Sequence, residues 1–159
     1  MTEKTLLIPK IESGIVIDHI PAGLGLKVLE IIHSYPEMSA VVTSVGLNYS
    51  SSKIAKKDMI KLQTQALPPR LMQHLAMAAP GVSVKRVERY RVVEKLVITV
   101  PETIVGTARC RNPGCITNHE RDVVTRFSCV DPGAKRFRCS FCEGIFPIHE
   151  LEVIVPSLV

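Results

Sequence analysis

The chain has 159 residues, a length that allows one compact domain or two small ones. Hydrophobic residues make up 46% and charged residues 22%, which is typical of a folded globular protein and excludes general disorder. The net charge of +5 permits an anionic ligand without requiring nucleic acid. No apolar run approaches the roughly 20 residues of a membrane span, and the start lacks the apolar core of a secretory signal. We therefore expect a cytoplasmic protein that makes no membrane contact.

Composition divides the chain into two segments that meet near Pro101. Residues 1–101 carry thirteen Lys and Arg against eight Asp and Glu, whereas residues 102–159 carry seven of each. All five cysteines and all four phenylalanines lie in the second segment, and all three tyrosines lie in the first. We therefore predict two domains, at residues 1–101 and 102–159.

The first segment alternates between short β-branched runs and apolar residues at helical spacing. Taken in chain order, these patterns predict strands at 6–8 and 14–17, a helix at 24–33, strands at 40–45 and 56–62, a helix at 69–79, and strands at 82–87 and 92–98. Pro21 suits the first turn of a helix, and the strand at 56–62 has the mixed polarity of an exposed strand. The order predicts an α+β protein: a ferredoxin-like split βαβ sandwich, followed by a small β-rich zinc domain.

Two cysteine pairs distinguish the second segment. Cys110 and Cys115 are separated by four residues, and Cys139 and Cys142 by two. Zinc prefers four soft donors in a tetrahedron, and each pair can form a turn that directs two sulfurs inward. Disulfides or buried thiols are the alternative, but a reducing cytosol disfavours disulfides. We predict one structural Zn²⁺ per chain, held by these four cysteines, with no coordination position open for catalysis.

Three other side chains could belong to the metal site. Cys129 shares a predicted strand face with Phe127 and is interpreted as a buried apolar residue. His119 and His149 could each replace a cysteine ligand, although four cysteines already saturate the site. Because the second segment is too short to bury a strong core, a bound metal would supply much of its folding free energy.

The lysines of the first segment allow two interpretations. Several of them could converge on one sheet face to bind phosphates, with Asp18 accepting a hydrogen bond from a sugar hydroxyl, or they could form a solvated charged surface. The lysines concerned are Lys56, Lys57, Lys61, Lys85 and Lys95. No Walker loop, GxGxxG motif, nucleophile elbow or Ser-His-Asp spacing is present, so nothing in the sequence argues for catalysis.

Several blocks of sequence point to a known family: GIVIDHIPAG at 14–23, GLN at 46–48, KDMIK at 57–61, and the two cysteine pairs. In this order, along nearly the whole chain, they resemble the regulatory chain of aspartate carbamoyltransferase. The resemblance implies a non-catalytic subunit of pyrimidine biosynthesis, with a nucleotide-binding domain followed by a zinc domain. It further implies CTP as inhibitor, ATP as activator, in some members UTP as well, docking of the zinc domain onto catalytic chains, and a dimer of regulatory chains.

The resemblance also implies roles for nine residues at the nucleotide site. Asp18 would contact the ribose, His19 and Lys95 the phosphates, and Lys61 the ribose and base. Lys57 corresponds to a further basic position close to the site. The wall of the base pocket corresponds to Ile11, Val16, Tyr90 and Val92.

In the second segment, the resemblance assigns the four paired cysteines as zinc ligands and places Asn112 and Glu143 at the contact with the catalytic chain. The chain departs from the family pattern at Lys85, where an Asn often lines the base pocket, and at Arg111 in the first cysteine loop. The apolar tail at 151–159 is also longer than expected, and it could add a strand to the zinc domain or cover an interface.

The main alternative function is that of a zinc-ribbon nucleic-acid-binding protein. Phe137 and Phe141 could stack on bases beside a set of arginines, namely Arg109, Arg111, Arg121, Arg126, Arg136 and Arg138. Against this function, the second segment has no net charge, and the basic excess lies in the first. A zinc-dependent hydrolase is excluded because no open coordination position or acid–base pair can be named. We therefore expect no nucleic-acid partner.

Overall fold

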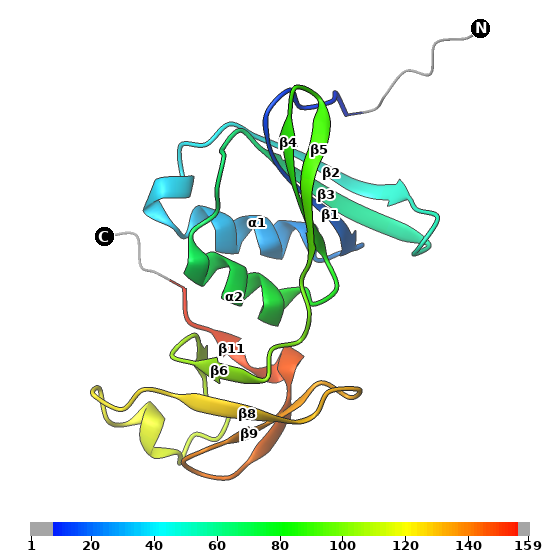
Figure 1. The fold of residues 1–159 in the computed structure, drawn as a ribbon. Coiled ribbons are helices and arrows are strands. Elements are labelled where there is room, and N and C mark those ends of the chain that lie inside the picture. The colour runs from blue at the N-terminus through cyan, green and yellow to red at the C-terminus, as the bar shows by residue number, and fades with distance from the viewer. Residues whose placement is uncertain (1–7, 156–159) are drawn as a thin grey trace, which may run out of the picture.

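The computed structural model describes residues 8–155, and its first half is an antiparallel sheet with strand order β2-β3-β1-β4-β5. The strands are β1 (Gly14–Pro21), β2 (Thr43–Ser50), β3 (Lys56–Leu62), β4 (Ser83–Glu88) and β5 (Arg91–Val97). Two helices, α1 (Gly25–His33) and α2 (Pro69–Ala78), cover one face, and a short 3-10 helix, η1 (Pro36–Met38), follows α1 (Figure 1). Apart from the added β5, this is the ferredoxin-like split βαβ arrangement, and the predicted α+β class is confirmed.

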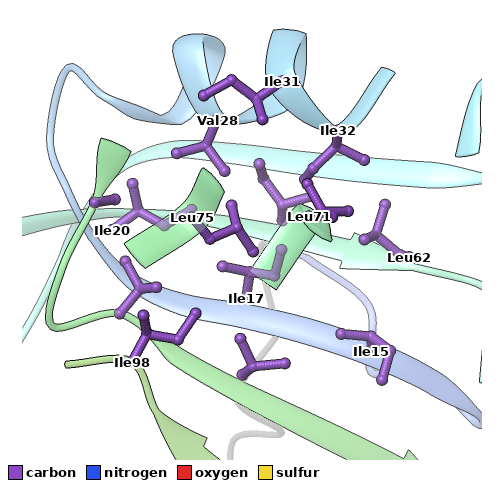
Figure 2. Packing of buried hydrophobic residues seen from close by; sticks show 14 of the residues in the cluster. Ile15, Ile17, Ile20, Val28, Ile31, Ile32, Leu62, Leu71, Leu75 and Ile98 are labelled. Carbon is purple, nitrogen blue, oxygen red and sulfur yellow. The ribbon is translucent and has the colours of Figure 1, made fainter. Parts of the chain in front are cut away.

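The main core lies between the helices and the sheet. In the central strand β1, Ile15 and Ile17 face the helices and belong to this core, whereas Val16 lies on the opposite face, as strand alternation requires. Figure 2 shows Ile17 close to Leu71 and Leu75 of α2. Helix α1 contributes residues spaced by three and four positions, which form a single apolar stripe: Val28, Ile31 and Ile32.

The second half of the chain is built from short strands in two small sheets, with orders β10-β9-β8-β6 and β11-β7. The strands are β6 (Thr103–Val105), β7 (Ala108–Arg109), β8 (Arg126–Asp131), β9 (Arg136–Cys139), β10 (Ile145–Pro147) and β11 (Glu152–Val153), with 3-10 helices η2 (Ile116–Asn118) and η3 (Ile148–Glu150). Phe127 and Phe137 are fully buried in a separate hydrophobic core. This half is therefore β-rich, as predicted.

Helix α2 contacts both halves of the structure. One side of the helix packs in the main core through Leu71 and Leu75, while Met77 belongs to the second core. The Thr107 hydroxyl donates a hydrogen bond to the sulfur of Met77 at 3.4 Å, and Arg70 Nη2 donates to the Gly106 carbonyl oxygen at 3.4 Å. The helix therefore joins the two cores physically, as its position in Figure 1 also shows.

The structure departs from the predicted elements at several places. The strand predicted at 40–45 begins three residues later, as β2, and continues to Ser50. Leu6 and Leu7 of the first predicted strand lie outside the described residues, and Ile8 is not in a strand. Pro21 ends β1 instead of beginning a helix, and α1 starts at Gly25. The strand at 56–62 is not an exposed edge, because it lies between β2 and β1 and buries every second side chain on the helix side. Polar and apolar residues both occur in this strand because one face of the sheet packs on the helices and the other does not.

The C-terminal segment adds a strand to the second half. Glu152 pairs with Arg109, and Val153 pairs with Ala108. These residues of the tail therefore add a strand, which was the first of the two roles expected for it. Residues 156–159 lie outside the described part of the chain. Within residues 8–155, neither helix is long and apolar enough to cross a membrane.

A buried carboxylate from β3 caps the first helix. Asp58 is 1% exposed, and its Oδ2 accepts hydrogen bonds from the backbone N–H groups of Gly23 at 3.1 Å and Gly25 at 2.9 Å. Its Oδ1 accepts another from the Asn48 N–H at 2.9 Å. Because the N-cap residue Leu24 has no side-chain acceptor, Asp58 satisfies the free N–H groups of the helix start and complements its dipole.

Replacing this cap should destabilise the fold. In Asp58→Ala, three backbone N–H groups lose their acceptor, and we expect the free energy of unfolding to fall by about 3 kcal/mol. Urea denaturation followed by circular dichroism measures the loss. Glu30→Ala, an exposed change on α1, is the control and should shift stability by less than about 0.5 kcal/mol. Equal stabilities for the two variants would contradict the capping role.

Candidate functional site

A one-residue bulge in β1 places Asp18 and His19 on the same side of the sheet. The pairing of β1 with β3 shifts between Ile17 and Ile20, where β1 contains one residue more than its partner. His19 there adopts a left-handed backbone conformation, with φ 59°, which costs a non-glycine residue on the order of 1 kcal/mol. As a result, His19 Nδ1 lies 3.3 Å from the hydroxyl of Ser83, the residue paired with Asp18 on β4.

Three lysines form a row with Val16 across the face opposite the helices. Lys61 of β3 pairs with Val16 of β1, Val16 pairs with Lys85 of β4, and Lys85 pairs with Lys95 of β5. Residues directly opposite one another in a sheet share a face, so their side chains project to the same side. We call this surface, with Asp18 and its neighbours, the lysine face.

Asp18 is held between two lysines, Lys85 of this row and Lys57 of β3. Lys57 Nζ lies 2.8 Å from its Oδ1, Lys85 Nζ lies 3.0 Å from its Oδ2, and the residue is 5% exposed. The backbone N–H of His19 also donates to Oδ1 at 2.7 Å. Burial alone would raise the pKa of Asp18, but the lysine and backbone hydrogen bonds outweigh it and lower the pKa to about 2. Asp18 is therefore ionised at neutral pH.

Two further side chains on the lysine face, His19 and Lys61, have pKa values shifted toward their neutral forms. Burial lowers the pKa of His19, and Lys57, Lys53 and Lys85 act in the same direction against the opposing effect of Asp18. Burial likewise lowers the pKa of Lys61, whose Nζ donates a hydrogen bond to the Pro9 carbonyl oxygen at 2.6 Å. Because the pKa values of His19 and Lys61 are lowered, a bound anion would stabilise the protonated, positively charged forms of these side chains.

Ser83, His19 and Asp18 lie together but do not form a catalytic triad. Both the Ser83 hydroxyl, at 3.3 Å, and the Asp18 carboxylate, at 3.9 Å, approach the same ring nitrogen, Nδ1. A triad requires the acid and the nucleophile on opposite nitrogens of the ring, so that a proton can pass through the histidine. Ser83 is also only 3% exposed, which closes it to a substrate. The lysine face is therefore arranged for binding an anion rather than for nucleophilic catalysis.

The remaining residues predicted for the nucleotide site lie at the apolar end of the same face. Gly14 and Val92 belong to one row across β1, β4 and β5, and a β-carbon at Gly14 would come within 2.7 Å of Ile11 Cδ1. Tyr90, in the turn between β4 and β5, donates its backbone N–H to the Glu12 carbonyl oxygen at 2.9 Å. All nine predicted residues thus lie on the lysine face or beside it.

Of the five lysines considered in the sequence, Lys56 does not reach this face, because it occupies the alternate position on β3 and is exposed. Lys85 does lie there and contacts Asp18. Ser83, beside His19, is a residue of this face that the sequence analysis does not identify. The alternation of polar Ser83 and Lys85 around Val84 was the available signal, but only the pairing of β4 with β1 places them beside Asp18.

The four paired cysteines come together in the second half of the structure. Their sulfur atoms all lie within 4.8 Å of one another, with 3.6 Å between Cys110 and Cys142 and 3.8 Å between Cys115 and Cys139. These distances exceed the roughly 2.05 Å of a disulfide bond. A tetrahedron of thiolates at about 2.3 Å from a central ion has edges of about 3.8 Å, so the cluster fits one tetrahedral metal ion.

Backbone turns shape the two cysteine loops. In the first, the Asn112 side-chain oxygen accepts from the Gly114 N–H at 3.0 Å, and Asn118 Nδ2 donates to the Cys110 carbonyl oxygen at 3.0 Å. In the second, Glu143 has a left-handed backbone with φ 62° and donates its N–H to the Cys139 carbonyl oxygen at 2.9 Å. Asn112 and Glu143 are therefore integral parts of the two loops.

The other candidate ligands lie outside the cysteine cluster. His119 Nε2 is 2.7 Å from the Pro113 carbonyl oxygen, and Cys129 packs beside the second core. Within residues 8–155 the metal-binding group contains neither His119 nor His149. Burial raises the pKa of Cys110 and of Cys139, so metal binding must displace protons from these thiols and is favoured by higher pH.

Removing one cysteine of the cluster should release the metal. We expect Cys139→Ser to lose the bound ion and to unfold the second core, because the small domain depends on metal-ligand bonds. Metal content by mass spectrometry and amide hydrogen exchange of residues 102–155 measure both effects. Cys129→Ser is the matched control and should retain the metal. Full metal occupancy in Cys139→Ser would contradict the four-cysteine site.

Comparison with known families gives one match for the half with the lysine face and another for the half with the cysteine cluster. The family model for the aspartate carbamoyltransferase regulatory chain, allosteric domain, matches residues 6–99, which include the lysine face. The model for the aspartate carbamoyltransferase regulatory chain, metal binding domain, matches residues 102–152, which include the cysteine cluster.

Individual relatives match over nearly their full length. The aspartate carbamoyltransferase regulatory chain of Pyrococcus abyssi is 39% identical over 146 residues, which cover 92% of this chain and 95% of the relative. The corresponding chains of Pyrobaculum islandicum and Thermoplasma volcanium are 39% and 36% identical, covering 93% and 90% of this chain and 98% and 93% of the relatives. The chain therefore belongs to the family of aspartate carbamoyltransferase regulatory chains, which are regulatory rather than catalytic subunits.

Proposed function

We propose that this chain binds CTP and ATP in competition at the lysine face and docks onto the catalytic chain of aspartate carbamoyltransferase. The observation that carries the proposal is the excess of positive charge around a single engaged carboxylate. Lys57 and Lys85 neutralise Asp18, while Lys61 and Lys95 have donors to spare for phosphates. Several cations can hold a triphosphate by charge-assisted hydrogen bonds without a glycine-rich loop.

The parts of a nucleotide correspond to successive parts of the lysine face. In our proposal, Asp18 accepts a hydrogen bond from the ribose, Lys61 reaches ribose and base, and His19 and Lys95 contact phosphates. Lys57 adds positive charge nearby. The base lies against Val16, in the row of lysines, and against Ile11, Tyr90 and Val92 at the apolar end. UTP has the same ribose and triphosphate and is a third candidate effector.

The metal in our proposal is one structural Zn²⁺ held by Cys110, Cys115, Cys139 and Cys142. Four thiolates at tetrahedral distances, three of them buried, favour zinc, and no position remains for water or substrate. When bound, such an ion supplies on the order of 10–16 kcal/mol of folding free energy to a small domain. The ordered loops would then present Asn112 and Glu143 to the catalytic chain. Reduced thiol ligands also support a cytoplasmic location.

Helix α2 is the element that could couple the two proposed sites. Its core side packs under β1, whose other face carries Asp18, and its Met77 packs in the core beside the cysteine cluster. We propose domains at 1–101 and 102–159 that communicate through this helix. Regulation then requires that the nucleotide bind two states of the enzyme with different affinities. Among residues 8–155, β2 and β5 are the edges of the five-stranded sheet, and such edges would allow two regulatory chains to form a dimer.

Calorimetric titration of the metal-loaded chain with CTP and ATP tests the nucleotide site. We expect one competing site per chain, and Lys95→Ala should weaken both nucleotides by about tenfold because it removes a phosphate contact. Lys27→Ala is the charge-matched control, because Lys27 is an exposed residue of α1 on the other side of the sheet. It should leave both affinities unchanged. A short single-stranded oligonucleotide is titrated in parallel. Tight oligonucleotide binding without a mononucleotide site would favour the nucleic-acid function instead.

The affinity for CTP should depend on the charge of His19. The pKa of His19 is lowered in the free protein, and a neighbouring phosphate would favour its protonated form against Lys53, Lys57 and Lys85. Binding should therefore tighten as pH falls from 8 to 6, by up to about tenfold per unit, the limit for uptake of one proton. Asp18, with a pKa of about 2, stays ionised throughout this range.

Titration of CTP in the same pH series with His19→Gln isolates this effect. The variant keeps a polar side chain but cannot take up the proton, and the titration of the nucleotide itself is common to both proteins. We expect the variant to bind with a smaller gain in affinity toward pH 6. Parallel pH profiles for the two proteins would exclude His19 from the phosphate contact.

A further inference from the structure

An open cavity of about 900 Å³ lies where helix α2 meets the loops of the metal domain. Its basic lining comes from distant parts of the chain: Arg70, Arg109, Arg111, His119 and Arg121. Arg70 stands in the first turn of α2, and the other four come from β7 and the loops that follow it. Two carboxylates, Glu120 and Glu152, also line the cavity, so its formal charge remains positive. This cavity is separate from the lysine face.

The cavity arginines have no carboxylate partner among residues 8–155. The ion pairs in this part of the chain involve Asp18 or Arg86, and none includes a cavity residue. Arg70 makes one long hydrogen bond, at 3.4 Å, to the Gly106 carbonyl oxygen. Guanidinium groups that face a shared cavity repel one another, and carboxylates can satisfy them in bidentate pairs. The arrangement thus favours a ligand that brings negative charge.

The surroundings of the cavity favour a protein ligand over a nucleic acid. Val124 lines it with its side chain 60% exposed, and Ile116, 51% exposed, adjoins the lining residue Thr117. Arginine combined with exposed aliphatic side chains is typical of protein interfaces. No Phe, Tyr or Trp lines the cavity to offer a large stacking surface to a base, and residues 102–159 have no net charge to attract a phosphate backbone.

We propose that this cavity receives an acidic segment of the catalytic chain, whose aspartate or glutamate side chains pair with Arg109, Arg111 and Arg121. The inference rests on the proposed docking function and adds a basic cavity to the contacts proposed for Asn112 and Glu143. Arg111 directly precedes Asn112, so the cavity is continuous with that contact. Because Arg70 belongs to α2, a segment seated there would also touch the helix that joins the two cores.

Charge reversal within the full-length, metal-loaded chain tests this inference. Arg121→Glu and the double variant Arg109→Glu/Arg111→Glu are titrated with the catalytic chain from the same organism, at several salt concentrations. Arg136→Glu, an exposed reversal on β9 outside the cavity, is the matched control. Metal content and CTP affinity are measured for every variant to establish folding. Arg121→Gln, which removes the charge without reversing it, serves if a reversal fails to fold.

We expect Arg121→Glu to weaken association by at least about tenfold, with a shallower salt dependence, and the double variant to weaken it further. Arg136→Glu should bind like the unmodified chain. Unchanged association in folded cavity variants would overturn the inference while leaving the proposed docking function intact. If the unmodified chain does not bind the catalytic chain, the docking function fails and the inference fails with it. Loss of oligonucleotide binding in Arg121→Glu, with association unchanged, would overturn it in favour of nucleic acid.

Discussion

The central strand β1 must serve two different environments, and the rest of the first half is arranged around that requirement. Ile15 and Ile17 face the helices, whereas Val16 and Asp18 face the opposite side. Strict alternation would direct His19 into the core, where an imidazole without partners is costly. The bulge avoids this cost and returns Ile20 to the core two positions after Asp18. The one additional residue of the bulge thus keeps Ile20 in the core and leaves His19 beside Asp18 on the opposite face.

Electrostatics on the lysine face depend on the same strand. Asp18 is the only carboxylate that the described ion pairs place among the lysines, and it binds Lys57 and Lys85 at once. Its negative charge allows the lysines to approach each other closely, but one carboxylate cannot neutralise all of them. The site is therefore pre-organised for an anion, since ordering the lysines requires no ligand. The cavity between α2 and the metal domain differs, because within residues 8–155 its arginines form no ion pair with a carboxylate.

The two halves of the chain are stabilised by different means. The first half has a continuous core between sheet and helices, whereas the second has a few buried residues around Phe127 and Phe137 beside four clustered thiols. A small core of this kind needs metal-ligand bonds to remain folded. Met77 extends that core onto α2, so the stability of the metal domain and the position of α2 are linked. Such a shared element can transmit a change between distant sites without a continuous network of polar contacts.

The sequence by itself determined the local features of this protein. Helical spacing located α1 and α2 within a few residues, and the spacing of two cysteine pairs was sufficient to indicate a metal site. These features depend on neighbours close in sequence, where spacing and turn propensity carry the information. Tertiary structure alone decided strand pairing: the interior place of β3, the contact of Lys85 with Asp18, and the cap that Asp58 provides for α1. It also decided the cavity that joins Arg70 to Arg121. Each of these brings together residues far apart in the chain, and their partners are selected by the packing of the whole sheet and core rather than by any local pattern.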